Sequence, residues 1–423
     1  MLRSIHGKCG FLALAFLMMH AIVVLPMASA QQSSLSFAPA VAYHTGGTEP
    51  TFVAVGDFNG DGSPDLAVAN SYLSDTIGIL LANGDGTFLR PVSYRTGGYA
   101  NTIIPIDLNG DGILDLVVSN QSRCFRCGAE GSISVFIGNG DGTFRLDRAY
   151  DSGGISFENN GFGHAEMAVA DLNGDGHLDI VIINCAAKRA SACGGGADGV
   201  ISVLFGNGDG TFQTAVNRSP GIRNPASGLA LGDVNGDGKL DVVLTSGLCS
   251  ISTACGAGKI DVLLGNGDGS FRAANHYATN GFGNGAVTLA DLNQDGFLDV
   301  VTGGCGLSNC WDGNGVVTVF LGNGDGSFQP AANHNSGGRL ADGIAVADFD
   351  GDGHLDIVVG NVVDDSVGVL LGNGDGSFRP ATIFPVLGGF AYGLTASDVN
   401  GDGKVDILVT SQTVVNVLLN SSK

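Results

Sequence analysis

Short apolar runs separated by clusters of glycine, asparagine and aspartate recur along the whole chain. A first run, such as residues 52–56, precedes an acidic stretch, and a β-branched run, such as residues 116–118, follows it. A third run, such as residues 133–137, leads into the turn Gly-Asn-Gly-Asp-Gly, which we call the glycine turn, and then into a more polar segment. Short β-branched runs bounded in this way predict strands, and Asn-Gly and Asp-Gly supply the positive φ of hairpin turns. Because no segment keeps a helical period, we predict an all-β chain built from four-stranded units.

The acidic stretch, which we call the acidic loop, has the pattern D-x-[ND]-x-D-G-x-x-D in seven copies, and these copies number the repeats one to seven. They begin at Asp57, Asp107, Asp171, Asp233, Asp291, Asp348 and Asp398. Successive copies start 50 to 64 residues apart, and a repeat of that length is typical of propeller architectures. The even spread of the copies favours one closed array. We therefore predict a single seven-bladed β-propeller over residues 31–423.

The two ends of the repeat region predict how the ring closes. The last repeat stops at residues 414–419, where its glycine turn and fourth strand would follow. Residues 37–47 match residues 88–98, which follow the glycine turn of repeat one. We therefore expect the N-terminal segment to supply the fourth strand of the last blade and to remove two free sheet edges. An open solenoid is the alternative.

Residues 1–30 have the pattern of a secretory signal peptide. Arg3 and Lys8 lie in a basic start, an apolar stretch covers residues 11–25, and Ala28-Ser-Ala30 fits a cleavage site. An uncleaved membrane anchor is the alternative, although the apolar stretch is short for a span. We expect a secreted or periplasmic protein that begins at Gln31 and has no membrane span after cleavage.

The cysteines agree with export. Eight of the nine form four close pairs: Cys124/Cys127, Cys185/Cys193, Cys249/Cys255 and Cys305/Cys310. Pairing within each loop is the simplest connectivity, and an oxidising compartment favours disulfides. The CxxC of the first pair could instead be redox-active or half of a zinc site.

The net charge excludes one class of partner. The formal net charge is −22, and no basic patch is visible that would hold a phosphate backbone, so nucleic acid is not an expected partner. Much of the acidity lies in the acidic loops. Carboxylates this close repel one another unless a cation lies among them, and Ca²⁺ prefers oxygen ligands of this kind and number. The glycine turns hold one aspartate each and are interpreted as plain hairpins.

We predict up to seven Ca²⁺ ions, each bound by side chains at loop positions 1, 3, 5 and 9 and by the backbone carbonyl at position 7. The predicted ligands are Asp57, Asn59, Asp61, Ser63 and Asp65; Asp107, Asn109, Asp111, Ile113 and Asp115; Asp171, Asn173, Asp175, His177 and Asp179; Asp233, Asn235, Asp237, Lys239 and Asp241; Asp291, Asn293, Asp295, Phe297 and Asp299; Asp348, Asp350, Asp352, His354 and Asp356; Asp398, Asn400, Asp402, Lys404 and Asp406. Gln294 replaces a glycine in the fifth loop and is expected to strain it. Asx-rich turns that need no metal are the alternative.

The acidic loop and the glycine turn followed by Thr or Ser and Phe together resemble the FG-GAP/VCBS repeat family, whose best-known relatives are the propellers of integrin α chains. The resemblance covers nearly all of residues 35–419. It implies that the acidic loop joins the first two strands of a blade and binds Ca²⁺. It does not imply one function, because the family includes adhesion receptors, lectins and modules attached to enzymes.

In a four-stranded meander, loops 1–2 and 3–4 share one face and loops 2–3 and 4–1 share the other. The cysteine pairs are therefore expected opposite the acidic loops, on loops suited to ligand binding. Candidate contacts on that face are Phe125, Arg126, Phe157, Phe162, His164, Trp311, Arg339 and Tyr392. The alternative for each is ordinary packing among the loops.

No metalloprotease or nucleophile-elbow motif is present, so no catalytic residue is assigned. We expect a monomeric, non-enzymatic binding or adhesion module for a glycan or protein ligand. Two alternatives remain. One is a propeller-based polysaccharide lyase or hydrolase, with carboxylates such as Glu158, Glu166, Asp342 or Asp364. The other is a structural or assembly component.

Overall fold

The computed structural model describes residues 35–71, 74–121, 130–155, 166–184, 186–187, 199–218, 226–247 and 255–423. These residues form strands β1 to β28 and a single turn of 3-10 helix, η1 (Val362–Asp364). The predicted all-β class is confirmed. Within the described part of the chain, no helix has the length and apolar character needed to cross a membrane.

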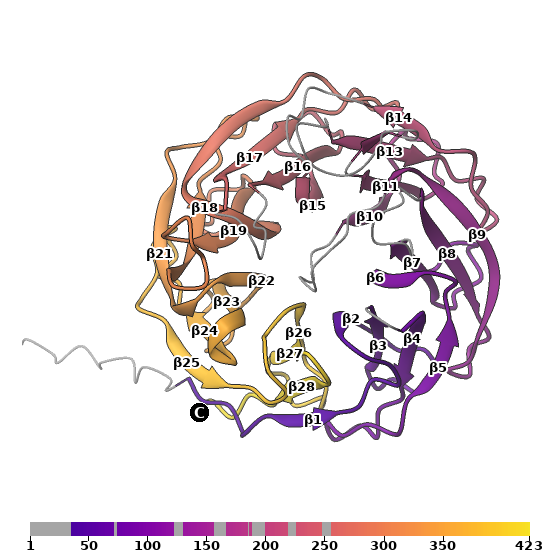
Figure 1. Ribbon diagram of the computed structural model, residues 1–423, viewed down its shortest axis with the longest axis horizontal. Helices are drawn as coiled ribbons and strands as arrows, with labels where there is room; N and C mark the ends of the chain where they lie inside the picture. The colour runs from indigo at the N-terminus through magenta and orange to yellow at the C-terminus, as the bar shows by residue number, and fades with distance from the viewer. Residues whose placement is uncertain are drawn as a thin grey trace, which may run out of the picture.

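Most repeats contribute four antiparallel strands that lie side by side, in order from the centre of the ring to its rim (Figure 1). The innermost strands are β2 (Pro50–Gly56), β6 (Tyr99–Ile106), β10 (Met167–Ala170), β15 (Ala226–Gly232), β22 (Ala341–Ala347) and β26 (Leu394–Ser397). The second strands are β3 (Asp65–Asn70), β7 (Asp115–Gln121), β11 (Asp179–Asn184), β16 (Asp241–Ser246), β19 (Asp299–Cys305), β23 (Asp356–Asn361) and β27 (Asp406–Thr410).

The outer half of each sheet is built in the same order. The third strands are β4 (Thr76–Leu80), β8 (Glu130–Gly138), β13 (Val200–Leu204), β17 (Ala257–Leu263), β20 (Asn314–Phe320), β24 (Ser366–Leu370) and β28 (Val415–Leu418). The outermost strands are β5 (Val92–Arg95), β9 (Phe144–Ile155), β14 (Val216–Arg218), β21 (Ala332–Arg339), β25 (Thr382–Pro385) and β1 (Val41–Tyr43), and β12 (Ala186–Ala187) adds a short edge to β9.

One long strand joins two neighbouring units. Strand β18 (Asn275–Ala290) pairs with β17 through its first half and with β19 through its second half. Strands β15 to β21 therefore form one seven-stranded sheet, and the described residues contain six hydrogen-bonded sheets. The predicted number of seven separate blades stays a prediction.

The N-terminal strand closes the ring as expected. Val41, Ala42 and Tyr43 of β1 pair with β28, which lies at the other end of the chain. Beyond this ladder, the backbone N–H of Ala38 donates to the carbonyl of Leu419 over 2.8 Å. On the inner side, Thr395 Oγ1 donates to the carbonyl of Val53 over 2.7 Å, so the last repeat also contacts the first.

The core lies between neighbouring sheets. All residues of the second strands are buried, which explains why these strands read as continuous apolar runs. One hydrophobic cluster contains Val53 and Leu66 from repeat one together with Leu408 and Val417 from repeat seven. The same packing therefore continues across the point where the ring closes.

Candidate functional site: the acidic loops

Each acidic loop joins an innermost strand to the second strand of its unit, as predicted. In repeat one the loop lies between β2 and β3, and Gly60 and Gly62 have φ angles of 72° and 85°. The carboxylate of Asp57 accepts the backbone N–H groups of Gly60 and Gly62 over 2.8 and 2.9 Å. Asn59 Oδ1 accepts the N–H of Asp61 over 2.9 Å. These bonds curl the chain around the carboxylate of Asp57.

In repeats one to six, the ninth-position carboxylate fixes the acidic loop to the glycine turn of the same repeat, which begins with Ala82 in repeat one. In repeat seven, where no glycine turn follows, the carboxylate of Asp406 accepts the N–H of Asn420 instead. Asp65 is fully buried, and its Oδ2 accepts the N–H of Phe58 over 3.0 Å while its Oδ1 accepts the N–H of Ala82 over 2.7 Å. Equivalent bonds occur in the other six repeats, where the carboxylates belong to Asp115, Asp179, Asp241, Asp299, Asp356 and Asp406. The two loops therefore share one face, which we call the acidic face.

Burial disfavours ionisation of this carboxylate. It raises the pKa of Asp65, two backbone N–H groups lower it, and the charges of Asp61 and Asp57 raise it further. In the sixth and seventh loops burial raises the pKa of Asp356 and Asp406 to about 6. A cation among these oxygens would favour the ionised form and lower the pKa.

The donor set fits a hard divalent cation. Oxygens that share one Ca²⁺ at about 2.3–2.6 Å lie within about 5 Å of one another. In the sixth loop, carboxylate oxygens of Asp348, Asp350 and Asp356 lie within 4.8 Å of one another. The oxygens that accept backbone N–H groups keep a second lone pair for a metal. The side chains at positions 1, 3 and 9 of the sixth loop are therefore suited to holding calcium, and the other six loops share its sequence pattern.

The fifth loop adopts the strained conformation that its sequence predicts. Gln294 has a φ of 59°, in the left-handed region where the other six loops have glycine. Its side-chain Nε2 donates to the carbonyl of Gly353 in the sixth loop over 2.8 Å. The glutamine therefore strains its own loop but adds a hydrogen bond to the neighbouring acidic loop.

Substitutions at Gln294 separate these two effects. Gln294→Ala keeps the strain and loses the bond to Gly353, so we expect a loss of roughly 1 kcal/mol in the free energy of unfolding. Gln294→Gly loses the same bond but removes the strain, so its stability should lie above that of Gln294→Ala. Urea unfolding of both variants measures the difference. Equal stabilities would contradict the role given to the positive φ.

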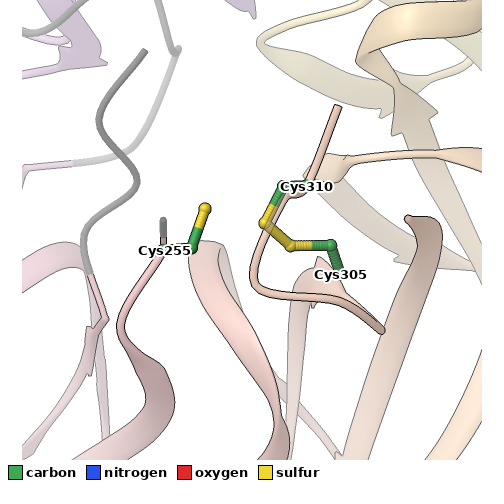
Figure 2. A group of neighbouring side chains, drawn as sticks. All are labelled: Cys255, Cys305 and Cys310. Carbon is green, nitrogen blue, oxygen red and sulfur yellow. A yellow bond between two sulfur atoms is a disulfide. The ribbon is translucent and has the colours of Figure 1, made fainter. Parts of the chain in front are cut away.

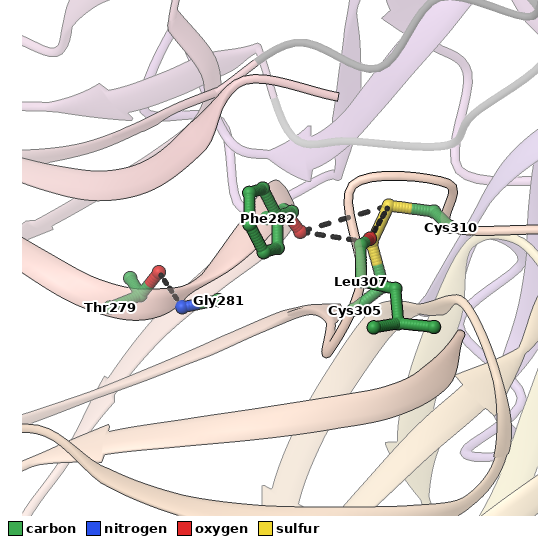
Figure 3. Close-up of a disulfide and its surroundings, with 6 residues drawn as sticks. All are labelled: Thr279, Gly281, Phe282, Cys305, Leu307 and Cys310. Carbon is green, nitrogen blue, oxygen red and sulfur yellow. Dashed lines mark hydrogen bonds between the residues drawn. A yellow bond between two sulfur atoms is a disulfide. The ribbon is translucent and has the colours of Figure 1, made fainter. Parts of the chain in front are cut away.

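The face opposite the acidic loops carries a disulfide between Cys305 and Cys310, whose Cα atoms are 5.4 Å apart (Figure 3). The carbonyl oxygen of Phe282 lies 3.0 Å from the sulfur of Cys305. Figure 2 shows Cys255 beside this bond, and the backbone N–H of Cys255 donates to the carbonyl of Ser308 over 2.7 Å. The cysteine-bearing loops of repeats four and five are therefore in contact.

The other cysteine pairs stay predictions. Cys124, Cys127, Cys185, Cys193 and Cys249 lie outside the described residues, and so do the signal segment 1–30 and the candidate contacts Phe125, Arg126, Phe157, Phe162 and His164.

The structure brings the three described candidate contacts together. Arg339 Nη1 donates to the carbonyl of Trp311 over 3.4 Å, and the Trp311 ring packs edge-on against Phe390, with centroids 6.1 Å apart. Phe390 in turn lies 5.9 Å from Tyr392. Tyr392 is only 8% exposed and burial raises its pKa, so its ring serves packing between loops. A ligand contact by Trp311 or Arg339 stays a prediction.

Sequence reasoning missed polar residues on the rim of the ring. Asn314, His334, Arg339 and Arg379 line a cavity between the outermost strand of repeat five and the segment before β25. The available signal was the histidine at a position where four other repeats have tyrosine. Arg339 lines this cavity as well as contacting Trp311.

Comparison with known proteins identifies the repeats. The FG-GAP-like repeat matches residues 57–118, 124–182, 191–244, 250–302, 308–359 and 348–409, and the FG-GAP repeat matches residues 162–204 and 226–263. Integrin alpha-E of Homo sapiens is 28% identical over 154 residues, which are 34% of this chain and 13% of that protein. Integrin alpha-PS3 of Drosophila melanogaster is 30% identical over 146 residues, which are 30% of this chain and 12% of that protein.

Solved structures similar to the chain include BBS1N in complex with ARL6DN, with 12% identity, coverage of 91% of this chain and 96% of that one, and a TM-score of 0.49. The Dos1 propeller has 11% identity, coverage of 88% and 77%, and a TM-score of 0.48. The exotype rhamnogalacturonan lyase YesX has 15% identity, coverage of 82% and 61%, and a TM-score of 0.44.

The match to the family rests on the feature from which the site is built. Each of the six segments that match the FG-GAP-like repeat contains at least one complete acidic loop, and together they include well over half of the residues. The chain spans only about an eighth of the length of the two integrin chains. The chain belongs to the FG-GAP-like repeat family.

Proposed function

We propose that this protein is an exported, calcium-binding β-propeller that acts as a non-enzymatic binding module for a glycan or protein ligand. The observation that supports calcium is the repetition of one arrangement in all seven acidic loops. Each places a curled, carboxylate-rich segment beside a buried ninth-position aspartate, which bonds to the glycine turn in repeats one to six, as Asp65 does, and to Asn420 in repeat seven. Carboxylates concentrated in this way are stabilised by Ca²⁺.

The binding role and the location rest on other observations. The repeats are similar to segments of two integrin alpha chains, and loops held by a rigid ring are suited to display binding groups. The disulfide between Cys305 and Cys310 agrees with an oxidising compartment. No side chain is assigned to catalysis.

Calcium content and ligand capture test this proposal. Elemental analysis of native protein should give several Ca²⁺ ions per chain, and a variant with Asp57 and Asp61 both changed to Ala should lose about one. A glycan array and an extracellular-matrix protein panel should then show retained ligand, whereas a polysaccharide panel should show no product. Calcium-free native protein would refute the metal assignment, and steady product release would refute the non-enzymatic role.

The stability of the metal-free protein should depend on pH through the carboxyl group of Asp406. Because burial raises its pKa to about 6, the folded state holds this proton more tightly than the unfolded state. Its contribution to stability is therefore complete below about pH 4 and is lost as the pH rises through about 6. With chelator present, the stability of wild type relative to Asp406→Asn should fall by up to about 3 kcal/mol over this rise.

Urea unfolding of both proteins at a series of pH values measures the effect. With calcium present the ionised carboxylate is favoured, so the stability of wild type relative to Asp406→Asn should instead increase as the pH rises. A difference between the two proteins that does not vary with pH in chelator would contradict the assignment.

A further inference from the structure

Outermost strands carry an aromatic residue that packs against the following repeat, except in repeat three, where Arg218 takes the position. In four repeats it is a tyrosine, and its ring packs edge-on against the phenylalanine after the next glycine turn; the pairs are Tyr43–Phe88, Tyr94–Phe144, Tyr150–Phe212 and Tyr277–Phe328. The hydroxyl of Tyr150 accepts the backbone N–H of Phe212 over 3.2 Å, which satisfies both groups.

His334 takes this position in β21 and behaves differently. Its ring packs edge-on against Phe378, with centroids 5.3 Å apart, as the tyrosines do. Its Nε2 atom, however, is buried and has no hydrogen-bond partner among the residues that the structure describes. Burial lowers the pKa of His334, so the neutral ring with one N–H and one acceptor nitrogen is favoured. A buried polar atom of this kind has lost its hydrogen bond to water without gaining another, so a ligand that bonds to it would be favoured.

His334 lines part of an open cavity of about 760 Å³, whereas the matching cavity beside Tyr150 has about 470 Å³. The larger volume lies within the range of small-molecule sites. Phe378 and Pro380 give it an apolar wall, and the exposed amides of Asn314 and Asn333 lie along it. Amides beside an apolar wall suit a ring that carries hydroxyl groups on its edge and C–H groups on its faces.

Two guanidinium groups border the cavity, and only one is fully engaged. Arg339 donates to the carboxylate of Asp364 through Nε and Nη2 over 2.8 and 2.6 Å. Arg379 lies 3.9 Å from Asp350 and 3.8 Å from Asp352, distances too long for direct hydrogen bonds. Arg379 can therefore turn its donors toward a ligand, and a planar guanidinium matches a carboxylate with two parallel bonds.

We propose that this cavity binds a hexuronate residue of an acidic saccharide, with Arg379 on the carboxylate and His334 and the neighbouring amides on the hydroxyl groups. The inference rests on the proposed binding function and names its ligand class and place. The site lies on the rim of the ring, between β21 and β25, and not on the opposite face.

The acidic loop of repeat six is linked to this cavity through Arg379. That loop is the one with aspartate, not asparagine, at its third position, and the extra carboxylate of Asp350 faces Arg379. A cation held by Asp348, Asp350 and Asp356 would compete with Arg379 for the charge of Asp350. Calcium would thus free Arg379 for the ligand and should tighten hexuronate binding. Because coupling between two bound ligands is reciprocal, hexuronate should tighten calcium binding by the same factor.

Titration calorimetry of the full chain in calcium tests the site, with an α-linked galacturonate trimer as probe and the matching neutral galactose trimer as comparison. We expect measurable binding of the acidic trimer and at least tenfold weaker binding of the neutral one. Arg379→Gln should weaken the acidic trimer by tenfold or more, and His334→Phe should weaken both. Gln213→Ala, at the position equivalent to Arg379 beside the smaller cavity, is the matched control and should change nothing.

A second variant isolates the link to the metal. Asp350→Asn gives the sixth loop the pattern of the other six, so it should keep its calcium while loosening Arg379. At low calcium this variant should bind the acidic trimer more tightly than wild type does, and equal affinities would refute the link.

The remaining outcomes separate this inference from the proposed function. No binding of either trimer by calcium-loaded protein of unchanged melting temperature would overturn the cavity assignment and leave the calcium proposal standing. Equal binding of both trimers, unaffected by Arg379→Gln, would overturn the hexuronate assignment. Calcium-free native protein that still binds the acidic trimer through Arg379 would refute the calcium proposal alone. Capture of a peptide ligand that Arg379→Gln abolishes would also overturn the saccharide assignment.

Discussion

Removal of calcium by excess EGTA should lower the melting temperature of this protein by more than about 10 °C. A ligand that binds only the folded state stabilises it by about 2.7 kcal/mol per site at a hundredfold excess over its Kd. Several acidic loops act together, and each kcal/mol corresponds to roughly 2–4 °C in a protein of a few hundred residues. Without an ion, close carboxylates such as those of Asp348, Asp350 and the buried Asp356 in the sixth loop repel one another.

Differential scanning calorimetry in EGTA, with calcium and with magnesium, measures this effect. Readdition of calcium should restore the melting temperature. Magnesium at the same concentration should restore less of it, because Mg²⁺ demands a stricter geometry and loses its water reluctantly. A melting temperature that does not change on chelation would contradict calcium binding by the acidic loops.

Asp241→Ala should be among the most destabilising single substitutions in the chain. Asp241 is fully buried, and its two oxygens accept the N–H of Val234 over 3.0 Å and the N–H of Gly265 over 2.7 Å. Alanine would leave both donors buried and unpaired, at about 1–3 kcal/mol each, and would also remove a predicted calcium ligand. We expect a loss of roughly 3–6 kcal/mol in the free energy of unfolding.

Two matched variants in the same repeat give the comparison. Asp268→Ala alters only the exposed glycine turn, where Asp268 accepts the N–H of Ser270, so it should cost about 1 kcal/mol or less. Asp233→Ala removes a ligand at the surface end of the loop, so its cost should shrink in EGTA, whereas the cost of Asp241→Ala should persist. Urea unfolding with and without chelator measures all three. Equal costs for Asp241→Ala and Asp268→Ala would contradict the distinction between the two kinds of Asp-Gly segment.

The fold could be predicted from the sequence because its signals are local and repeated. The β-branched runs, the glycine turns and the match between residues 37–47 and 88–98 led to four-stranded units and to the pairing of β1 with β28. The acidic loops were found for the same reason, since all their side-chain ligands lie within nine residues. The merging of two units through β18 had no such signal, because a turn replaced by continuous strand depends on packing between repeats.

The second role of the ninth-position aspartate was not evident from sequence. Its spacing indicated a metal ligand, but its bond to the glycine turn joins residues far apart, such as Asp241 and Gly265. The rim cavity was missed for a related reason. His334 and Arg379 belong to different repeats, and only the contact between neighbouring outer strands places them around one space.

The pairing of β1 with β28 constrains the order in which the sheets form during synthesis. During synthesis β1 emerges first, but its partner strand appears only after some 370 further residues. The sheets between them can form one after another, whereas the sheet that unites both ends must wait for the complete chain. Premature termination would thus leave β1 unpaired and the last sheet incomplete. Both defects lie at the same place, where a chaperone or protease could recognise the truncated chain.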